Sequence, residues 1–209
     1  MPASQLKLKT KEVLQGDFKI EKLNLLFVFQ VNCPGCFLQA FPIANLLYEN
    51  YSKKGLKILG LSTAFENFDL NTLENTKRLI EKGELTGEAK LVLNRLGHKK
   101  LPFKISFDVA FDLLTPRDFK NVGKEAEDYC RHIDGFDEAS QDRKNVIRAQ
   151  LKKYFLDKKF TTFTFEKNKL QGTPAWILFN QEFQILYQCF GNQEYAFFQN
   201  LVNSYLPKA

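Results

Sequence analysis

The sequence predicts an α/β fold, and three observations carry that prediction. An apolar run from Leu25 to Val31, rich in aromatic and β-branched residues, has the pattern of a buried strand. Apolar residues at helical spacing then continue to Ser52, and Gly55 ends this helix. A second compact strand follows at residues 56–62. A strand, a helix and a strand in this order form a right-handed βαβ unit with a parallel strand pair.

The elements around this unit are placed by the same periodicities. A polar lead-in, residues 7–16, comes before a predicted half-buried edge strand at 18–23, where apolar and polar residues alternate. Pro42 lies inside the first helix and should bend its axis. Helices are predicted at 71–82, which opens with a capping-type pattern, and at 87–96.

The C-terminal half adds strands to the predicted sheet. Residues 103–109 alternate between apolar and polar, which predicts a strand. After the turn that contains Gly172 and Pro174, an apolar strand runs to Asn180, and residues 184–190 form its antiparallel partner in a hairpin. A terminal helix should follow from Tyr195 to Tyr205 and cover the sheet. The prediction is thus a central mixed sheet flanked by helices.

A segment of about fifty residues interrupts this pattern. Between residues 111 and 160 charged residues crowd together and apolar positions recur every three or four residues, with the clearest helix from Asn145 to Leu156. We therefore expect one domain over residues 1–209, with its core at 18–110 and 160–208 and a helical insertion at 111–160. The insertion contains no motif that indicates chemistry.

Composition narrows the classes of function. The hydrophobic share of 44%, with 21 Phe, favours a packed globular chain over a disordered one. No apolar run approaches the ~18 residues of a membrane span, so we expect no membrane partner. The net charge of +6 is spread as Lys among Glu and Asp, which indicates a solvated surface and no nucleic-acid partner. Residues 1–10 contain no secretory signal pattern, and we expect a cytoplasmic protein.

Two cysteines, Cys33 and Cys36, stand where the buried strand runs into the helix. Pro34 suits a first helical turn because it has no N–H to lose, so Pro34 and Gly35 should start the helix directly after Cys33. A thiol at a helix N-terminus is exposed to the positive end of the helix dipole, which favours the thiolate. Cys33 is therefore the candidate nucleophile, and Cys36 the thiol that resolves its mixed disulfide.

The same spacing is also typical of half a zinc site or of a structural cysteine pair. A structural zinc ion needs about four ligands, including a second closely spaced pair. The remaining candidates are scattered, apart from the neighbours Cys130 and His132; they are Cys130, Cys189, His98 and His132. We therefore predict redox chemistry and no metal site, with Cys130 and Cys189 as structural thiols and both histidines at the surface.

These motifs together resemble the thioredoxin superfamily. They are the βαβ unit with Cys-x-x-Cys at its strand-to-helix turn, the additional strand, and Gly172-Thr173-Pro174 leading into a ββα ending. The segment before the first crossover and residues 101–108 look most similar to the TlpA-like and peroxiredoxin-related branch. The resemblance covers about 18–110 and 160–208, and implies a thioredoxin-like fold with a helical insertion before the cis-proline strand.

The resemblance also implies roles for single residues. Cys33 matches the family's attacking cysteine, Cys36 its resolving cysteine and Pro174 its cis-proline, beside which Thr173 would pair with a bound substrate segment. The sequence departs from the pattern at four places: Phe27 replaces a buried acid, Asn32 replaces a frequent Trp, Pro-Gly replaces Gly-Pro between the cysteines, and the helix proline stands one place later relative to Cys36. No acid or His beside the motif is evident as a base for Cys36.

The sequence thus predicts a thiol-disulfide oxidoreductase, acting as a disulfide reductase on protein or small-molecule disulfides. An external electron donor would regenerate the dithiol; we expect a monomer and no cofactor. One alternative is a peroxiredoxin-like thiol peroxidase, although Gln30 stands where that family has a Thr. Another is a redox-regulated binding protein with the insertion as its partner surface.

Overall fold

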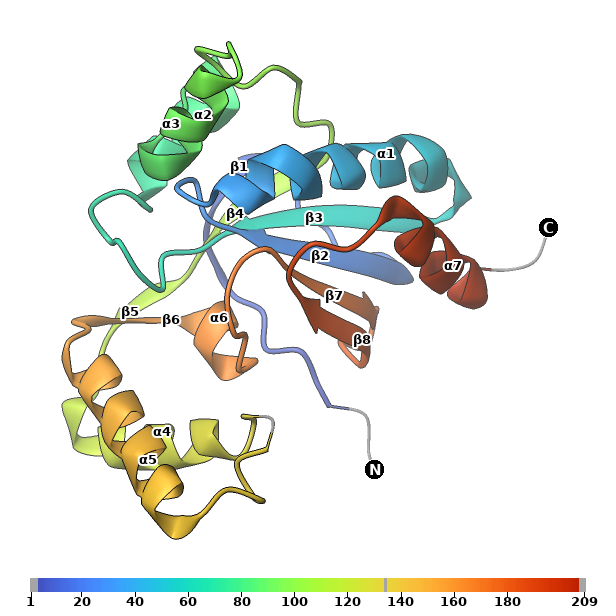
Figure 1. Cartoon of the computed structure of the whole chain (residues 1–209). Coiled ribbons are helices and arrows are strands. Elements are labelled where there is room, and N and C mark those ends of the chain that lie inside the picture. The colour runs from blue at the N-terminus through green and yellow to red at the C-terminus, as the bar shows by residue number, and fades with distance from the viewer. Residues whose placement is uncertain (1–3, 134, 207–209) are drawn as a thin grey trace. The chain divides into compact units, whose positions relative to one another are not determined.

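The computed structural model describes residues 4–133 and 135–206. The chain divides into two compact units, a larger one built from residues up to 113 and from 163 onward, and a smaller one at 114–162. The smaller unit overlaps the helical insertion predicted at 111–160. The larger unit contains a mixed sheet with helices packed on it, so the predicted fold class is confirmed (Figure 1).

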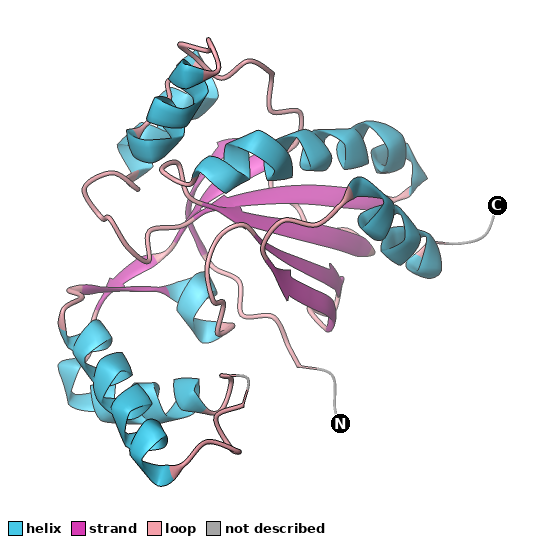
Figure 2. Cartoon of the chain, in the orientation of Figure 1, coloured by secondary structure: helices cyan, strands magenta, loops and turns pink. Residues whose placement is uncertain are grey.

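The sheet of the larger unit has the order β1-β4-β3-β2-β7-β8. Strands β2, β3 and β4 run parallel, whereas β1, β7 and β8 join the sheet in antiparallel pairs (Figure 2). The strands span β1 (Thr10–Gln15), β2 (Leu23–Phe29), β3 (Leu56–Ser62), β4 (Asp108–Asp112), β7 (Ala175–Asn180) and β8 (Ile185–Phe190). The chain therefore places the carboxyl end of β2, where the cysteine motif begins, at the centre of the sheet.

The βαβ unit forms as the sequence predicts, but its helix starts irregularly. All residues of β2 are buried, and it pairs in parallel with β3. Between them lie a π-helical turn η1 (Cys36–Ala40), the helix α1 (Phe41–Tyr51) and a short turn η2 (Ser52–Lys54). The Phe41 N–H bonds to the Cys36 carbonyl across the wider turn. Pro42 stands directly after it, in the first turn of α1, where it has no N–H to donate back into the π-helical turn.

Helices cover both faces of this sheet with separate cores. Side chains of β2 such as Phe27 pack with α1 and with α7 (Tyr195–Tyr205), whose Phe198 and Val202 are fully buried. The opposite face packs against the short helix α6 (Phe163–Lys167) and the N-terminal segment, including Leu6. This two-sided burial explains why β2 reads as a continuous apolar run instead of an alternating one.

The helix predicted at 71–82 is present as α2 (Leu73–Lys82), followed by α3 (Gly87–Arg95). Thr72 caps α2, because its hydroxyl accepts a hydrogen bond from the Asn75 N–H. Gly83 ends α2 in the left-handed conformation, with a φ of 67°. Both helices therefore lie where the sequence signals put them.

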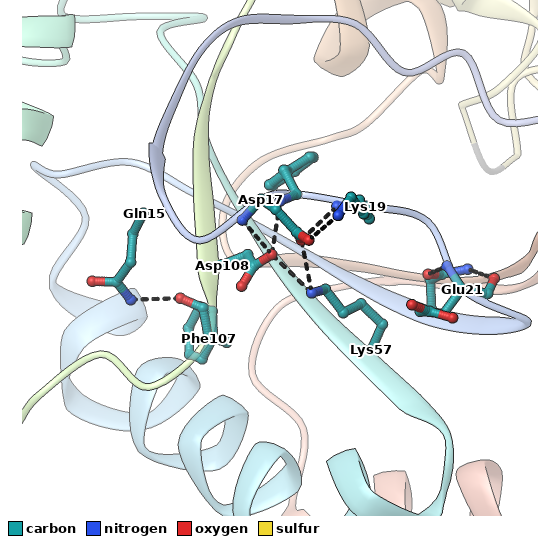
Figure 3. Close-up of polar contacts among 9 residues, drawn as sticks. Gln15, Asp17, Lys19, Glu21, Lys57, Phe107 and Asp108 are labelled. Atoms are coloured by element: carbon teal, nitrogen blue, oxygen red, sulfur yellow. Dashed lines mark hydrogen bonds and ion pairs between the residues drawn. The ribbon is translucent and has the colours of Figure 1, made fainter.

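The predicted edge strand at 18–23 is wrong, and the edge strand is instead β1, within the expected polar lead-in. Phe18 has a left-handed φ of 52°, which no strand allows. The N–H groups of Asp17 and Phe18 donate to the Asp108 carboxylate, which also pairs with Lys57 at 2.8 Å (Figure 3). These bonds tie Asp17 and Phe18 to β4, and the pairing of β1 with β4 extends the sheet back to Thr10.

The strand predicted at 103–109 is shifted in the structure, where β4 begins only at Asp108. In residues 104–107, backbone groups form hydrogen bonds with side chains instead of with a neighbouring strand. Gln15 donates to the Phe107 carbonyl at 2.6 Å (Figure 3). It also donates to the Ile105 carbonyl at 2.9 Å, and Asn45 bonds the backbone on either side of Ile105. Apolar alternation here reflects burial of Ile105 and Phe107 without strand pairing.

The smaller unit has a modest core of its own. Val122, Ala126 and Phe155 form its buried centre. Its elements are β5 (Leu114–Pro116), η3 (Phe119–Asn121), α4 (Val122–Cys130), α5 (Gln141–Leu156) and β6 (Phe160–Thr162). The helix predicted from Asn145 begins earlier, at Gln141, where Ser140 caps it. Among the described residues, no helix is both long and apolar enough to cross a membrane.

Candidate functional site

The cysteine motif lies directly between β2 and the first helix. Cys33 precedes the helical residues Pro34 and Gly35; its N–H donates to the Gln30 carbonyl at 3.1 Å, and its carbonyl accepts from the Cys36 N–H at 3.2 Å. Both thiols are free, with Cys33 half-buried and Cys36 fully buried. The first sulfur can therefore meet a substrate, whereas the second is closed off from solvent.

The two thiols have opposite proton affinities. A hydrogen bond from the Cys36 thiol is the largest cause that lowers the pKa of Cys33, to about 6, and backbone groups of Cys36 and Gly35 add to it. Burial raises the pKa of Cys36 well above its usual value, and the neighbouring Cys33 raises it further. At neutral pH, Cys33 is thus mainly a thiolate and Cys36 a thiol that donates to it.

A loop before β7 completes the site. The Thr173–Pro174 peptide bond is cis, and the Cys33 Sγ lies 3.4 Å from the Thr173 carbonyl oxygen, to which the thiol form donates. A Cβ at Gly35 would lie 4.0 Å from Cδ of Pro174, so the helix start also approaches this loop. The structure therefore brings together all six residues predicted for the site: Cys33, Pro34, Gly35, Cys36, Thr173 and Pro174. Their roles in binding and catalysis stay predictions.

A pocket of about 460 Å³ opens beside Cys33. Its size lies within the range of small-ligand sites. The described residues that line it are Gln30, Asn32, Cys33, Pro34, Phe65, Glu66, Glu88, Gln171, Gly172, Thr173 and Phe190. A substrate group in this pocket would lie against the half-buried sulfur.

Gln30 joins two walls of this pocket, a role that sequence reasoning missed. Its side chain is 3% exposed, and its Oε1 accepts from the Thr173 hydroxyl at 3.1 Å. Its Nε2 donates to the Glu66 carbonyl at 3.4 Å. The buried amide thereby connects the loop around Thr173 with the loop after β3. The only sequence signal was a polar residue at the end of an otherwise apolar run.

Asn32 connects the motif to a third wall, the start of α3. Its N–H donates to the Asn71 side chain at 3.1 Å, and its Oδ1 accepts from the Glu88 N–H at 2.7 Å. A Cβ at Gly87 would collide with Asn32, so only glycine allows this close approach. The residue that departs from the family's frequent Trp therefore anchors a helix beside the nucleophile.

Phe190 forms the outer edge of the pocket and packs on Gly172. Its side chain is half exposed, and a Cβ at Gly172 would lie 2.5 Å from Cε2 of the ring. The absence of a side chain at Gly172 lets the ring pack directly on the loop before Thr173. The sequence marked Gly172 as a turn residue but gave no signal for its aromatic neighbour.

The other candidate residues lie outside the site. Cys130 is buried in α4 of the smaller unit, and Cys189 lies in β8, where burial raises its pKa to about 11. The Nδ1 of His132 bonds to the Asp128 carbonyl at 2.8 Å. Among the described residues, no three His, Cys, Asp or Glu side chains group as metal ligands would.

Solved structures with this fold match nearly the whole chain. A thiol-disulfide isomerase from Corynebacterium glutamicum is 22% identical, with a TM-score of 0.60 over 99% of this chain and 98% of its own. A thioredoxin-like superfamily protein is 17% identical, with a TM-score of 0.57 over 100% and 98%. A thiol:disulfide interchange protein from Bacteroides sp. is 16% identical, with a TM-score of 0.51 over 100% and 92%.

These similarities establish a thioredoxin-like fold for this chain, as its sequence motifs predicted. No protein-family model and no curated protein matches the sequence. The chemistry of the site therefore has to be argued from its own residues.

Proposed function

We propose that the protein is a thiol-disulfide oxidoreductase that reduces disulfide bonds with its Cys33–Cys36 dithiol. The observation that carries the proposal is the pair of opposed proton affinities: a half-buried Cys33 with a pKa of about 6, beside a buried Cys36 that keeps its proton. A nucleophile and a delayed second thiol are what two successive thiol-disulfide exchanges require. The pocket beside Cys33 and the Thr173 carbonyl supply a place for the substrate.

The proposed reduction proceeds through two successive thiol-disulfide exchanges. The Cys33 thiolate attacks one sulfur of the substrate disulfide, forms a mixed disulfide with it and releases the other sulfur as a thiolate, which takes up a proton. Cys36 then gives up its proton and attacks the Cys33 sulfur, which releases the second substrate thiol. Two electrons pass from the dithiol to the substrate, and Cys33 and Cys36 end as a disulfide.

The reducing direction fits the cytoplasmic location expected from the sequence, because cytosolic thiols are kept reduced. In that direction an external dithiol donor has to return the two electrons, and no other cofactor takes part. The expected monomeric state stays a prediction.

Reduction of insulin, followed by the turbidity of the released B chain with dithiothreitol as donor, tests the proposal. We expect activity in the parent protein and none in Cys33→Ser. Mixed with insulin after the dithiothreitol has been removed, Cys36→Ser should instead accumulate a mixed disulfide, visible by mass spectrometry. Cys189→Ala, which changes a thiol outside the site, should retain the parent rate. An inactive parent, or equal activity in Cys33→Ser, would refute the mechanism.

The alternatives from the sequence receive no specific support. Gln30, which stands where the peroxiredoxin-like alternative has a Thr, accepts a hydrogen bond from the Thr173 hydroxyl. Hydroperoxide consumption well above that of free cysteine would restore that alternative. In the smaller unit some apolar side chains are exposed, including Phe119 and Val146, but nothing shows what partner they would bind.

A further inference from the structure

The charged side chains that line the pocket beside Cys33 are all negative. Of the described residues that line the pocket, the charged ones are Glu66 and Glu88, and no Lys, Arg or His is among them. The chain as a whole has the opposite balance, with 30 Lys and Arg against 24 Asp and Glu. The entrance to the nucleophile is therefore acidic on a basic protein.

Both glutamates are held in place by their backbones. The Glu66 carbonyl accepts from the side chains of Asn71 at 2.9 Å and of Gln30 at 3.4 Å. The Glu88 N–H donates to Asn32, the residue before Cys33, at 2.7 Å. The two residues thus form fixed parts of the wall, attached to the same turn that positions the nucleophile.

Their carboxylates, in contrast, have no bonding partner among the described residues. Both side chains are exposed, and among the described residues neither carboxylate forms an ion pair or a hydrogen bond. The N-terminus of α3 contributes about half a positive charge beside Glu88, which two full negative charges outweigh. The pocket therefore has a net negative charge, which would attract a cationic group of a bound substrate.

We propose that this acidic wall selects disulfides in polypeptide segments that carry Lys or Arg next to the cysteine, and disfavours anionic disulfides. The inference rests on the proposed function, since it concerns the substrate of the same site. A cationic flank would lie near Glu66 and Glu88 while its disulfide lies against Cys33, and the exposed ring of Phe190 would contact its apolar atoms. Like charges at the same place would repel an acidic segment.

Three forms of one short peptide test the inference. Each contains a single cysteine as a mixed disulfide with mercaptoethanol, flanked by lysine, glutamine or glutamate. Rates of reduction at low salt are measured for the parent protein, for Glu66→Gln with Glu88→Gln, and for Glu49→Gln with Glu81→Gln. The last pair removes the same charge from exposed residues of α1 and α2, away from the pocket.

In the parent we expect the lysine peptide to react roughly three- to tenfold faster than the glutamate peptide, as two exposed charge pairs allow. The preference should shrink as salt screens the charges, fall below about twofold in the pocket variant, and persist in the control variant. Flanking charges also change the intrinsic reactivity of each peptide disulfide. That effect is the same for all three proteins, so it cancels when their rate ratios are compared.

Two results overturn the inference, and they are distinguishable. If the glutamine peptide is reduced but the parent shows no charge preference, or the pocket variant keeps it, the inference fails and the proposed function stands. If the glutamine peptide is not reduced at all, the proposed function fails and the inference fails with it.

Discussion

Cys33 and Cys36 stand three positions apart, yet their surroundings separate their chemistry. The buried thiol donates to the half-buried one, so the pKa of Cys33 falls to about 6 while burial raises the pKa of Cys36. An attacking thiolate and a protonated partner then coexist at neutral pH. Such a divergence of neighbouring titratable groups is a general mark of assigned acid and base roles.

The first prediction concerns that hydrogen bond. In the parent, the rate of Cys33 alkylation by iodoacetamide should rise with pH through a midpoint at about 6. Cys36→Ala removes the largest cause of the lowered pKa, so the midpoint should move upward and the rate at neutral pH should fall. An unchanged midpoint would show that the backbone groups alone stabilise the thiolate.

The second prediction concerns Gln30 and Thr173, which we expect to act as one unit through their 3.1 Å hydrogen bond. Gln30→Leu and Thr173→Val should each lower kcat/KM for insulin about fivefold, the worth of one hydrogen bond of about 1 kcal/mol. The double variant should be no worse than the poorer single variant. Cys33 alkylation, which needs no ordered substrate loop, should stay near the parent rate.

Gln39→Leu is the matched control for Gln30. Its side chain also bonds to a backbone carbonyl, that of Gln193 at 3.5 Å, but it does not line the pocket. We expect parent activity in this variant. Strictly additive losses at Gln30 and Thr173 would mean that the two residues contribute independently.

At the scale of elements, the sequence predicts best where local and tertiary signals agree. The run from Leu25 to Val31 is buried on both faces, and Thr72 with Gly83 brackets a helix by caps that act locally. The sequence predicts wrongly where side chains from distant parts of the chain determine the backbone conformation. Apolar and polar residues alternate over 18–23, but Asp108 and Lys57 hold the preceding turn in a conformation that a strand does not have. No residue near position 18 indicates these distant contacts.

The third prediction concerns the end of β4. Burial raises the pKa of Asp112 to about 6, although the N–H groups of Thr164 and Phe165 and the Thr63 hydroxyl bond to its carboxylate. The folded protein therefore holds this proton more tightly than the unfolded chain between pH 3.8 and about 6. Stability should fall as pH rises through this window, by up to about 3 kcal/mol from this group.

Urea unfolding at several pH values measures this effect. Asp112→Asn cannot ionise, so its stability should lack the decline between pH 4 and 6, although its amide leaves one of the donors without an acceptor and lowers stability at every pH. Asp118→Asn, which changes an exposed carboxylate of the smaller unit, should keep the parent profile. The same slope in Asp112→Asn and the parent would assign the pH dependence to other groups.

At the scale of the whole molecule, the candidate site was predictable only in part. Cys33 and Cys36 stand close together in one segment, and the Gly172-Thr173-Pro174 motif is distinctive enough to be assigned to the same site. Asn32, Glu66 and Glu88 come together only through the packing of separate loops, held by side-chain bonds to backbone groups. No periodicity or spacing marks such residues, because each is an ordinary polar residue in its own segment.

The fourth prediction concerns the smaller unit. The chain leaves and re-enters the larger unit at adjacent points, since the Phe163 N–H donates to the Leu113 carbonyl at 2.8 Å. Replacing residues 114–162 by a short Gly-Ser linker should therefore leave a folded protein with its Cys33 alkylation midpoint still at about 6. Circular dichroism and alkylation measure this. Loss of folding would mean that residues 114–162 contribute to the stability of the larger unit.

The complete enclosure of Cys36 also governs how the protein withstands damage. An oxidant arriving from solvent meets Cys33 first and converts it to a sulfenic acid. The neighbouring thiol, which the oxidant cannot reach, then condenses with that acid and expels water. The oxidation product would thus be the same Cys33–Cys36 disulfide that the proposed reductase cycle forms, and the donor proposed for that cycle would reduce it again.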